Sequence, residues 1–215
     1  MIAGKTITLV FLTNTHKEKI HLNLYAREIQ MLRHKTILKK ESTGLLLIDI
    51  QERINAVMKY GEVVVENTVK LIQGFKALKL PIFITEQYRK GLGPTESQIL
   101  EELDESSIVE KLTFSCCGSS ELMTQLQDKN IQQVVICGIE THVCVQQTAL
   151  DLLANEFQVY LVKDAVSSRT KIDHKTAINR LRHEGIIITT AESVLFELLV
   201  KANTTVFKEI SNIVK

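Results

Sequence analysis

Short apolar runs and amphipathic stretches alternate along the chain from Gly44 onward. The apolar runs predict strands buried on both faces, at residues 45–50, 82–85, 134–137, 159–162 and 186–188. Helical periodicity lies between and after them, at about residues 62–79, 119–129, 144–155, 171–183, 191–201 and 205–214. Repeated strand–helix units with short connections predict an α/β fold with three layers, α/β/α, around a mostly parallel, Rossmann-like sheet.

Composition narrows the class of protein. A chain of 215 residues with 45% hydrophobic content suits one compact domain with a sizeable core. The net charge of +1 and the lack of Trp argue against a nucleic-acid partner. No apolar run approaches the ~20 residues of a transmembrane helix, so no membrane partner is expected.

The first 40 residues differ from the rest. They carry eight Lys and Arg against two acidic residues, and they show no clear hydrophobic period. We therefore expect an N-terminal extension over residues 1–40 and a catalytic-type domain over residues 41–215. The extension is a weak match to a transit peptide. An extra helix at about residues 21–33, or an over-extended start with Met31 as the true initiator, are the favoured interpretations.

The four cysteines have neither CxxC pairing nor zinc-site spacing, and they favour a reducing cytoplasm; they are Cys116, Cys117, Cys137 and Cys144. Cys144 begins a predicted helix just after a predicted strand, where the helix dipole favours thiolate over thiol. A lone cysteine is more often a small buried hydrophobe, so Cys144 needs support from its context. A disulfide between the adjacent Cys116 and Cys117 would be strained, which makes a redox role the weaker interpretation.

Ligands of parallel sheets bind at the carboxyl ends of the strands, and four polar stretches are predicted there. Asp49 lies inside an apolar run, where a carboxylate is costly unless it has a partner or a task. Glu86 and Gln87 follow the second predicted strand, and residues 140–144 follow the third. Asp164 follows the fourth and is better interpreted as an N-cap or loop anchor.

Lys111 is a further candidate, although a lysine is usually a solvated surface residue. Beside a cysteine and a carboxylate it would stabilise a thiolate. His142 is two residues from Cys144 and cannot face it across a helix, while His174 and His183 lie on a charged, solvent-facing helix. These positions leave Asp49 as the base. Residues 85–90 lack the clustered His and Asp that a divalent metal site needs.

With these residues in place, the chain resembles the isochorismatase-like cysteine hydrolase family over about residues 44–213. Three separated motifs in family order carry the resemblance: Asp49 within residues 46–51, Lys111 before Thr113-Phe114-Ser115, and Cys144 within residues 138–145. Further similarity at residues 85–88, 91–95 and 164–169 points to the isochorismatase-domain-containing subgroup.

The resemblance implies a triad in which Asp49 takes the thiol proton, Lys111 supports the ion pair and Cys144 attacks an amide-like carbonyl to form a thioester. It also implies a cis peptide bond between Ile139 and Glu140, with the N–H groups of Glu140 and Cys144 facing the oxyanion. Gln87, Ile139 and Glu140 are thus expected on the substrate and oxyanion side.

The resemblance implies no cofactor and no metal. The metal-binding Asp/His set of nicotinamidases is missing around Gln87, which disfavours nicotinamide, and true isochorismatases lack the cysteine. We expect a metal-independent cysteine hydrolase that cleaves a small amide-like C–N bond, acting as a homo-oligomer on a small-molecule substrate. The alternative is a catalytically silent protein that keeps the fold for binding or as a scaffold.

Overall fold

The computed structural model describes residues 33–103 and 108–215. The chain divides into two units, residues 1–35 and 36–215, and the sheet belongs to the second. The helix predicted over residues 21–33 and the proposed start at Met31 lie outside the described residues, apart from Arg33. No helix in the described part of the chain has both the length and the apolar character needed to cross a bilayer.

Within these ranges, six parallel strands form one sheet in the order β3-β2-β1-β4-β5-β6. The strands are β1 (Thr43–Ile48), β2 (Ile82–Gln87), β3 (Ile108–Lys111), β4 (Gln133–Ile139), β5 (Gln158–Ser167) and β6 (Ile187–Thr189). Strand β1 lies at the centre and pairs with β2 on one side and β4 on the other. The predicted α/β class and parallel sheet are confirmed.

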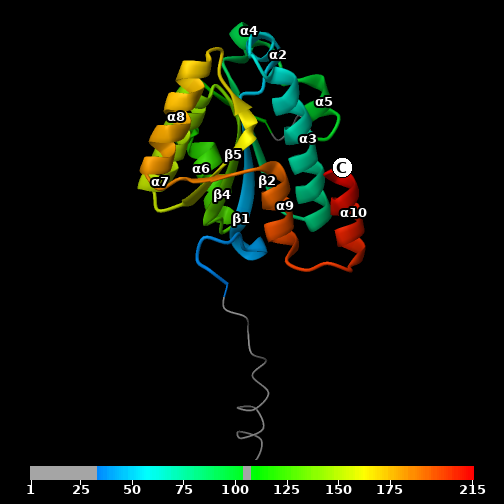
Figure 1. The fold of residues 1–215 in the computed structure, drawn as a ribbon. Helices are drawn as coiled ribbons and strands as arrows, with labels where there is room; N and C mark the ends of the chain where they lie inside the picture. The colour runs from blue at the N-terminus through cyan, green and yellow to red at the C-terminus, as the bar shows by residue number, and fades with distance from the viewer. Residues whose placement is uncertain (1–32, 104–107) are drawn as a thin grey trace, which may run out of the picture. The chain divides into compact units, whose positions relative to one another are not determined.

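Helices cover both faces of the sheet (Figure 1). One layer holds α3 (Gly61–Leu78), α9 (Ala191–Leu199) and α10 (Thr205–Ile213), and the other holds α6 (Ser120–Asp128), α7 (Gln146–Ala154) and α8 (Lys171–His183). Alternate residues of β1 feed the two cores: Leu45 and Leu47 pack in the first, and Leu46 and Ile48 in the second. This double burial explains why the central strands are continuous apolar runs.

Short helical segments lie in the loops between the main elements. They are η1 (Lys40–Ser42), α2 (Glu52–Asn55), α4 (Arg89–Leu92), α5 (Ser97–Leu100), η3 (Cys116–Gly118) and the π-type turn η4 (Thr141–Val145). None of the three short α-helices was predicted, because four residues are too few to show a helical period.

Strand β5 is longer than predicted. It continues past Val162 to Ser167, so Asp164 lies inside the strand and not after it. The pairing with β4 shifts between Ile136 and Gly138, and beyond the shift Ile139 pairs with Ser167. This irregularity carries the segment after β5 alongside the end of β4, which is where the candidate site lies.

Gly138 allows β1 and β4 to approach closely just before that site. Its φ is +134°, and a Cβ at this position would lie 2.1 Å from the carbonyl oxygen of Ile48. Any side chain would therefore push the two central strands apart.

Candidate active site

Three sequence-predicted side chains meet at the carboxyl edge of the sheet. Asp49 follows β1, Lys111 ends β3, and Cys144 lies in η4 just after β4. The carboxyl ends of parallel strands share one edge, so residues far apart in the sequence come together there. All three are buried, with exposed fractions of 1% for Asp49, 4% for Lys111 and 7% for Cys144.

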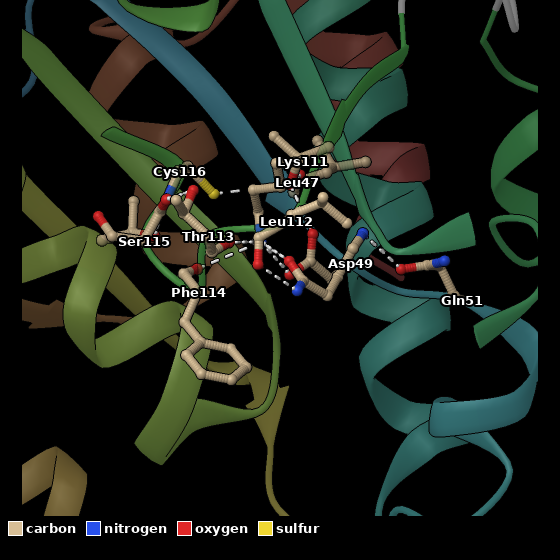
Figure 2. A network of polar contacts seen from close by, with 12 residues as sticks. Leu47, Asp49, Gln51, Lys111, Leu112, Thr113, Phe114, Ser115 and Cys116 are labelled. Carbon is tan, nitrogen blue, oxygen red and sulfur yellow. Dashed lines mark hydrogen bonds and ion pairs between the residues drawn. The ribbon is translucent and has the colours of Figure 1, made fainter. Parts of the chain in front are cut away.

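Asp49 and Lys111 form a buried ion pair. Lys111 Nζ lies 2.7 Å from Asp49 Oδ2, and the contact is drawn in Figure 2. Asp49 is in a left-handed backbone conformation, with φ of +53°, and it lies outside the strand in which the sequence placed it. The chain therefore turns at the end of β1.

The Lys111 ammonium group makes all its hydrogen bonds within the protein. Besides Asp49, it donates to Gln87 Oε1 at 2.9 Å and to the carbonyl oxygens of Thr113 and Phe114 at 3.2 Å each. Its three protons are thus shared among four acceptors. Gln87 was predicted on the substrate side. Its Oε1 accepts from Lys111, and its Nε2 donates to the carbonyl oxygen of Leu112.

Burial and charge act in opposite directions on this pair. Burial raises the pKa of Asp49 above its ordinary value, and the positive charge of Lys111 opposes that rise without cancelling it. Burial alone would lower the pKa of Lys111, but the negative charge of Asp49 raises it overall. The carboxylate is therefore a stronger base than a solvated aspartate, and the lysine keeps its charge.

Cys144 lies close enough to Asp49 for each group to shift the pKa of the other. Burial, and then the negative charge of Asp49, raise the pKa of Cys144. This direction is opposite to the one expected for a cysteine at the start of a helix. Cys144 lies in the π-type turn before α7, and desolvation next to a carboxylate outweighs a helix dipole there.

The two residues where β4 meets the turn that holds Cys144 differ in which of their groups lie near the site. The peptide bond between Ile139 and Glu140 is cis, as the resemblance implied. The Ile139 side chain is fully buried in the core, so only its backbone remains near the site. The Glu140 carboxylate accepts from the backbone N and the Nε of Arg169, at 3.0 and 3.1 Å.

The histidines near the site face other partners than Cys144. His142 Nδ1 lies 3.0 Å from Ser168 Oγ, and its Nε2 lies 4.0 Å from Asp173 Oδ2. His174 was predicted to face solvent, and this is wrong: it is half-buried, with Nδ1 3.0 Å from Thr141 Oγ1. His174 packs back onto the turn that carries the nucleophile, a tertiary contact that helical periodicity cannot show.

Two further expectations concern anchors and metals. Asp164 accepts a hydrogen bond at 3.0 Å from the N–H of Ala191, the first residue of α9, so it anchors the start of a helix, as expected, but from within β5 and not from a loop. Among the described residues, no group of three or more His, Cys, Asp or Glu side chains is arranged to hold a metal ion.

Sequence reasoning assigned no role to several residues that frame the site. Thr85 donates to Asp49 Oδ1 at 2.8 Å. Buried Glu86 accepts from the backbone N–H and the hydroxyl of Thr95, while Gln51 donates to the carbonyl of Gly93. These contacts tie the loop after β2 to the end of β1. The sequence signal for these residues is that polar positions follow a buried strand. This signal indicates where the side chains lie but not which groups they contact.

Comparison with known proteins agrees with this geometry. The isochorismatase domain model matches residues 43–193. Isochorismatase domain-containing protein 1 of Danio rerio is 41% identical over 172 residues, which cover 78% of this chain and 59% of that protein. This chain thus spans less than two thirds of that relative's length.

Two solved structures share the fold. The MAR1 ribonuclease from Caenorhabditis elegans aligns with a TM-score of 0.78 at 34% identity, over 82% of this chain and 91% of that one. The YcaC gene product from Escherichia coli, described as an octameric hydrolase of unknown specificity, has a TM-score of 0.78 at 20% identity over 85% and 91%. At that identity the second likeness concerns the fold alone. The domain match covers most of the chain and includes all three converging residues: the protein belongs to the isochorismatase-domain family.

Proposed function

We propose that this protein is a metal-independent cysteine hydrolase that cleaves an amide-like C–N bond of a small molecule through a covalent thioester. The observation that carries the proposal is that one buried carboxylate, Asp49, pairs with the Lys111 ammonium and lies close enough to the Cys144 thiol for each to shift the pKa of the other. A base, a charge partner and a nucleophile gathered at one buried point form the constellation that nucleophilic catalysis needs.

In the first half-reaction, Asp49 takes the proton of Cys144 as the sulfur attacks the substrate carbonyl. The charge that develops on the carbonyl oxygen is met by the backbone N–H groups of Glu140 and Cys144. The intermediate collapses by breaking the C–N bond, and the proton held by Asp49 goes to the departing amine. Lys111 makes no direct contact with substrate in this scheme, because its protons are already committed.

In the second half-reaction, Asp49 takes a proton from water as the water oxygen attacks the thioester. The C–S bond breaks, the acid product leaves, and the proton returns to the Cys144 sulfur. The raised pKa of Asp49 suits both transfers, since a base is most effective when its pKa approaches the working pH.

We place the protein in the cytoplasm and expect it to work as a homo-oligomer. The four cysteines are free thiols, which suits a reducing compartment. The octameric YcaC structure shows that this fold can assemble, and exposed apolar residues Leu112 and Phe114 lie on the loop beside Lys111. An oligomer that covers this loop would shield the site from water.

The test combines thiol labelling with an activity screen. Iodoacetamide should label Cys144 faster than the other three cysteines, and Asp49→Asn should slow that labelling. Purified protein should hydrolyse a member of a small-amide library, and Cys144→Ala should lower kcat by about 10⁴-fold or more. Cys117→Ala is the matched control: Cys117 is a half-buried free thiol outside the triad, and this variant should keep full activity.

Three results would count against the proposal. Equal labelling of all four thiols would remove its main support. A folded protein with selective Cys144 labelling but no turnover of any amide would favour the binding or scaffold role. Since the Caenorhabditis elegans neighbour is named a ribonuclease, the screen includes RNA, and turnover of RNA alone would replace the proposed substrate class.

A further inference from the structure

Thr85 holds Asp49 at two points. It lies in β2, fully buried, beside the turn at the end of β1. Its carbonyl oxygen accepts from the backbone N–H of Asp49 at 3.2 Å, and its hydroxyl oxygen lies 2.8 Å from Asp49 Oδ1. The backbone and the carboxylate of the proposed base are thus fixed by one residue.

The direction of the hydroxyl contact follows from proton counting. Thr85 has a single hydroxyl proton, and an ionised carboxylate can only accept. The alternative acceptor, the carbonyl of Leu47, is 3.5 Å away, so the proton goes to Asp49. The Thr85 oxygen then accepts from the thiol of Cys116, whose Sγ lies 3.6 Å away. The chain of donors runs from Cys116 through Thr85 to Asp49.

The two oxygens of Asp49 therefore have separate partners. Oδ1 receives Thr85, and Oδ2 receives Lys111 at 2.7 Å. With both oxygens fixed, the plane of the carboxylate is fixed too, and Cys144 meets it in one orientation. Asp49 is in the left-handed region, where local backbone preference does not hold an aspartate in place, so these contacts determine its position.

We propose that Thr85 is a positioning residue of this site, which orients the Asp49 carboxylate so that it faces Lys111 and Cys144 together. The inference rests on the proposed function and adds to it a residue outside the triad. Thr85 acts through Asp49 and touches no substrate. Cys116 is a buried thiol that the proposed mechanism does not use, and it donates to the Thr85 hydroxyl oxygen.

Four groups from different elements act on the Asp49 carboxylate or lie near it. They are Lys111 at the end of β3, Cys116 in η3, Cys144 in η4 and the Thr85 hydroxyl in β2. Burial raises the pKa of Asp49, and Lys111, Thr85 and Cys144 each lower it. Removal of the Thr85 hydroxyl should therefore move the pKa of Asp49 further upward.

The experiment follows the pH dependence of Cys144 alkylation by iodoacetamide, which needs no substrate. In the unmodified protein the rate should fall on the acid side as Asp49 becomes protonated. In Thr85→Val this acid limb should move to higher pH by about one unit, so that the rate at a fixed pH on the limb falls about tenfold. Thr85→Ser keeps the hydroxyl and should restore the limb.

Thr43→Val is the matched control, because Thr43 is an equally buried, hydrogen-bonded threonine at the opposite end of β1. It should lose stability but keep the acid limb. A limb that does not move in folded Thr85→Val overturns the proposal and leaves the proposed function standing. If Cys144 shows no acid limb even in the unmodified protein, the proposed function fails as well. Should Thr85→Val not fold, Thr85→Ala removes the same hydroxyl with less bulk.

Discussion

The two ends of the central strands carry two buried polar networks of opposite character. At the amino end, neutral groups surround Gln133, the first residue of β4. At the carboxyl end, the network is built on the charges of Asp49 and Lys111. Both networks are hydrogen-bonded throughout their core, yet only the carboxyl-end network combines a buried ion pair with a nearby thiol.

The amino-end network joins the start of the compact unit to the sheet. Gln133 Oε1 accepts from the backbone N–H of Lys39 at 2.6 Å, and its Nε2 lies 3.0 Å from the Tyr160 hydroxyl. Tyr160 in turn donates to the carbonyl of Thr36 at 2.9 Å. The hydrogen bonds of Gln133 within the described residues are all with uncharged groups, and the Glu197 carboxylate accepts from the backbone N–H of Leu38 at 3.1 Å; together these contacts fix the path of residues 36–39.

The difference shows what charge adds and what it costs. A buried neutral bond contributes about 1 kcal/mol net, and its partners can be replaced by apolar groups at little cost. A buried ion pair loses several kcal/mol of hydration per ion and recovers it only while both partners are present. The carboxyl-end network should therefore be the more fragile of the two.

Loss of one charge at the carboxyl end should have the largest effect on stability. Lys111→Met leaves Asp49 buried without its counter-ion, and the free energy of unfolding should fall by about 3–5 kcal/mol. The loss should be smaller at low pH. Burial already raises the pKa of Asp49, and without Lys111 the folded state can accept a proton and bury the neutral acid. Urea denaturation at several pH values measures the loss in the free energy of unfolding and its dependence on pH.

The double variant Asp49→Leu with Lys111→Met is the control for that prediction. It removes both charges and should recover a large part of the stability, although not the activity. If the double variant is as unstable as Lys111→Met alone, unpaired charge is not the cause of the loss, and the contrast between the two networks fails.

Loss of the amide at the amino end should have an intermediate effect. Gln133→Leu leaves the N–H of Lys39 and the hydroxyl of Tyr160 without their buried partner, and the expected cost is about 1–3 kcal/mol. Gln132→Leu is the matched control, because the neighbouring side chain is exposed and should matter little. A cost for Gln133→Leu equal to that of Lys111→Met would show that charge is not what separates the two ends.

The smallest effect is expected at His174, which lies in α8 and contacts Thr141 in the turn that holds Cys144. Burial, and then the positive charge of Lys163, lower the pKa of His174 from its ordinary value of 6.5. Below that pH the unfolded chain binds a proton that the folded state does not, so stability falls as pH falls. His174→Gln should flatten this slope in unfolding curves between pH 7 and pH 5. Identical slopes for the two proteins would contradict it.

The central fold could be predicted from the sequence because its strands are buried on both faces. The runs that became β1 and β4 are apolar in nearly every position, and the amphipathic period of α3 is long. The edge strand β3 was not predicted, since its pattern of Ile, Val, Glu and Lys is short and half polar. The extension of β5 through Lys163 and Asp164 was missed for the same reason.

For the site, residue types and strand ends indicated Asp49, Lys111 and Cys144, but not their contacts. Nothing in the sequence indicates that Lys111 has four acceptors, or that Thr85 faces the carboxylate. Those facts depend on side-chain directions across neighbouring strands. The direction of the pKa shift of Cys144 was wrong because local position in a turn says nothing about desolvation by the rest of the fold.

The position of Lys111 on an edge strand makes the site depend on the outermost part of the sheet. Asp49 and Cys144 follow the two central strands, whereas Lys111 ends a strand of four residues whose one neighbour in the described sheet is β2. The charge network therefore reaches from the centre of the sheet to one of its edges, and a change that loosens only the short strand β3 would remove the cation from Asp49 while the central strands stay paired.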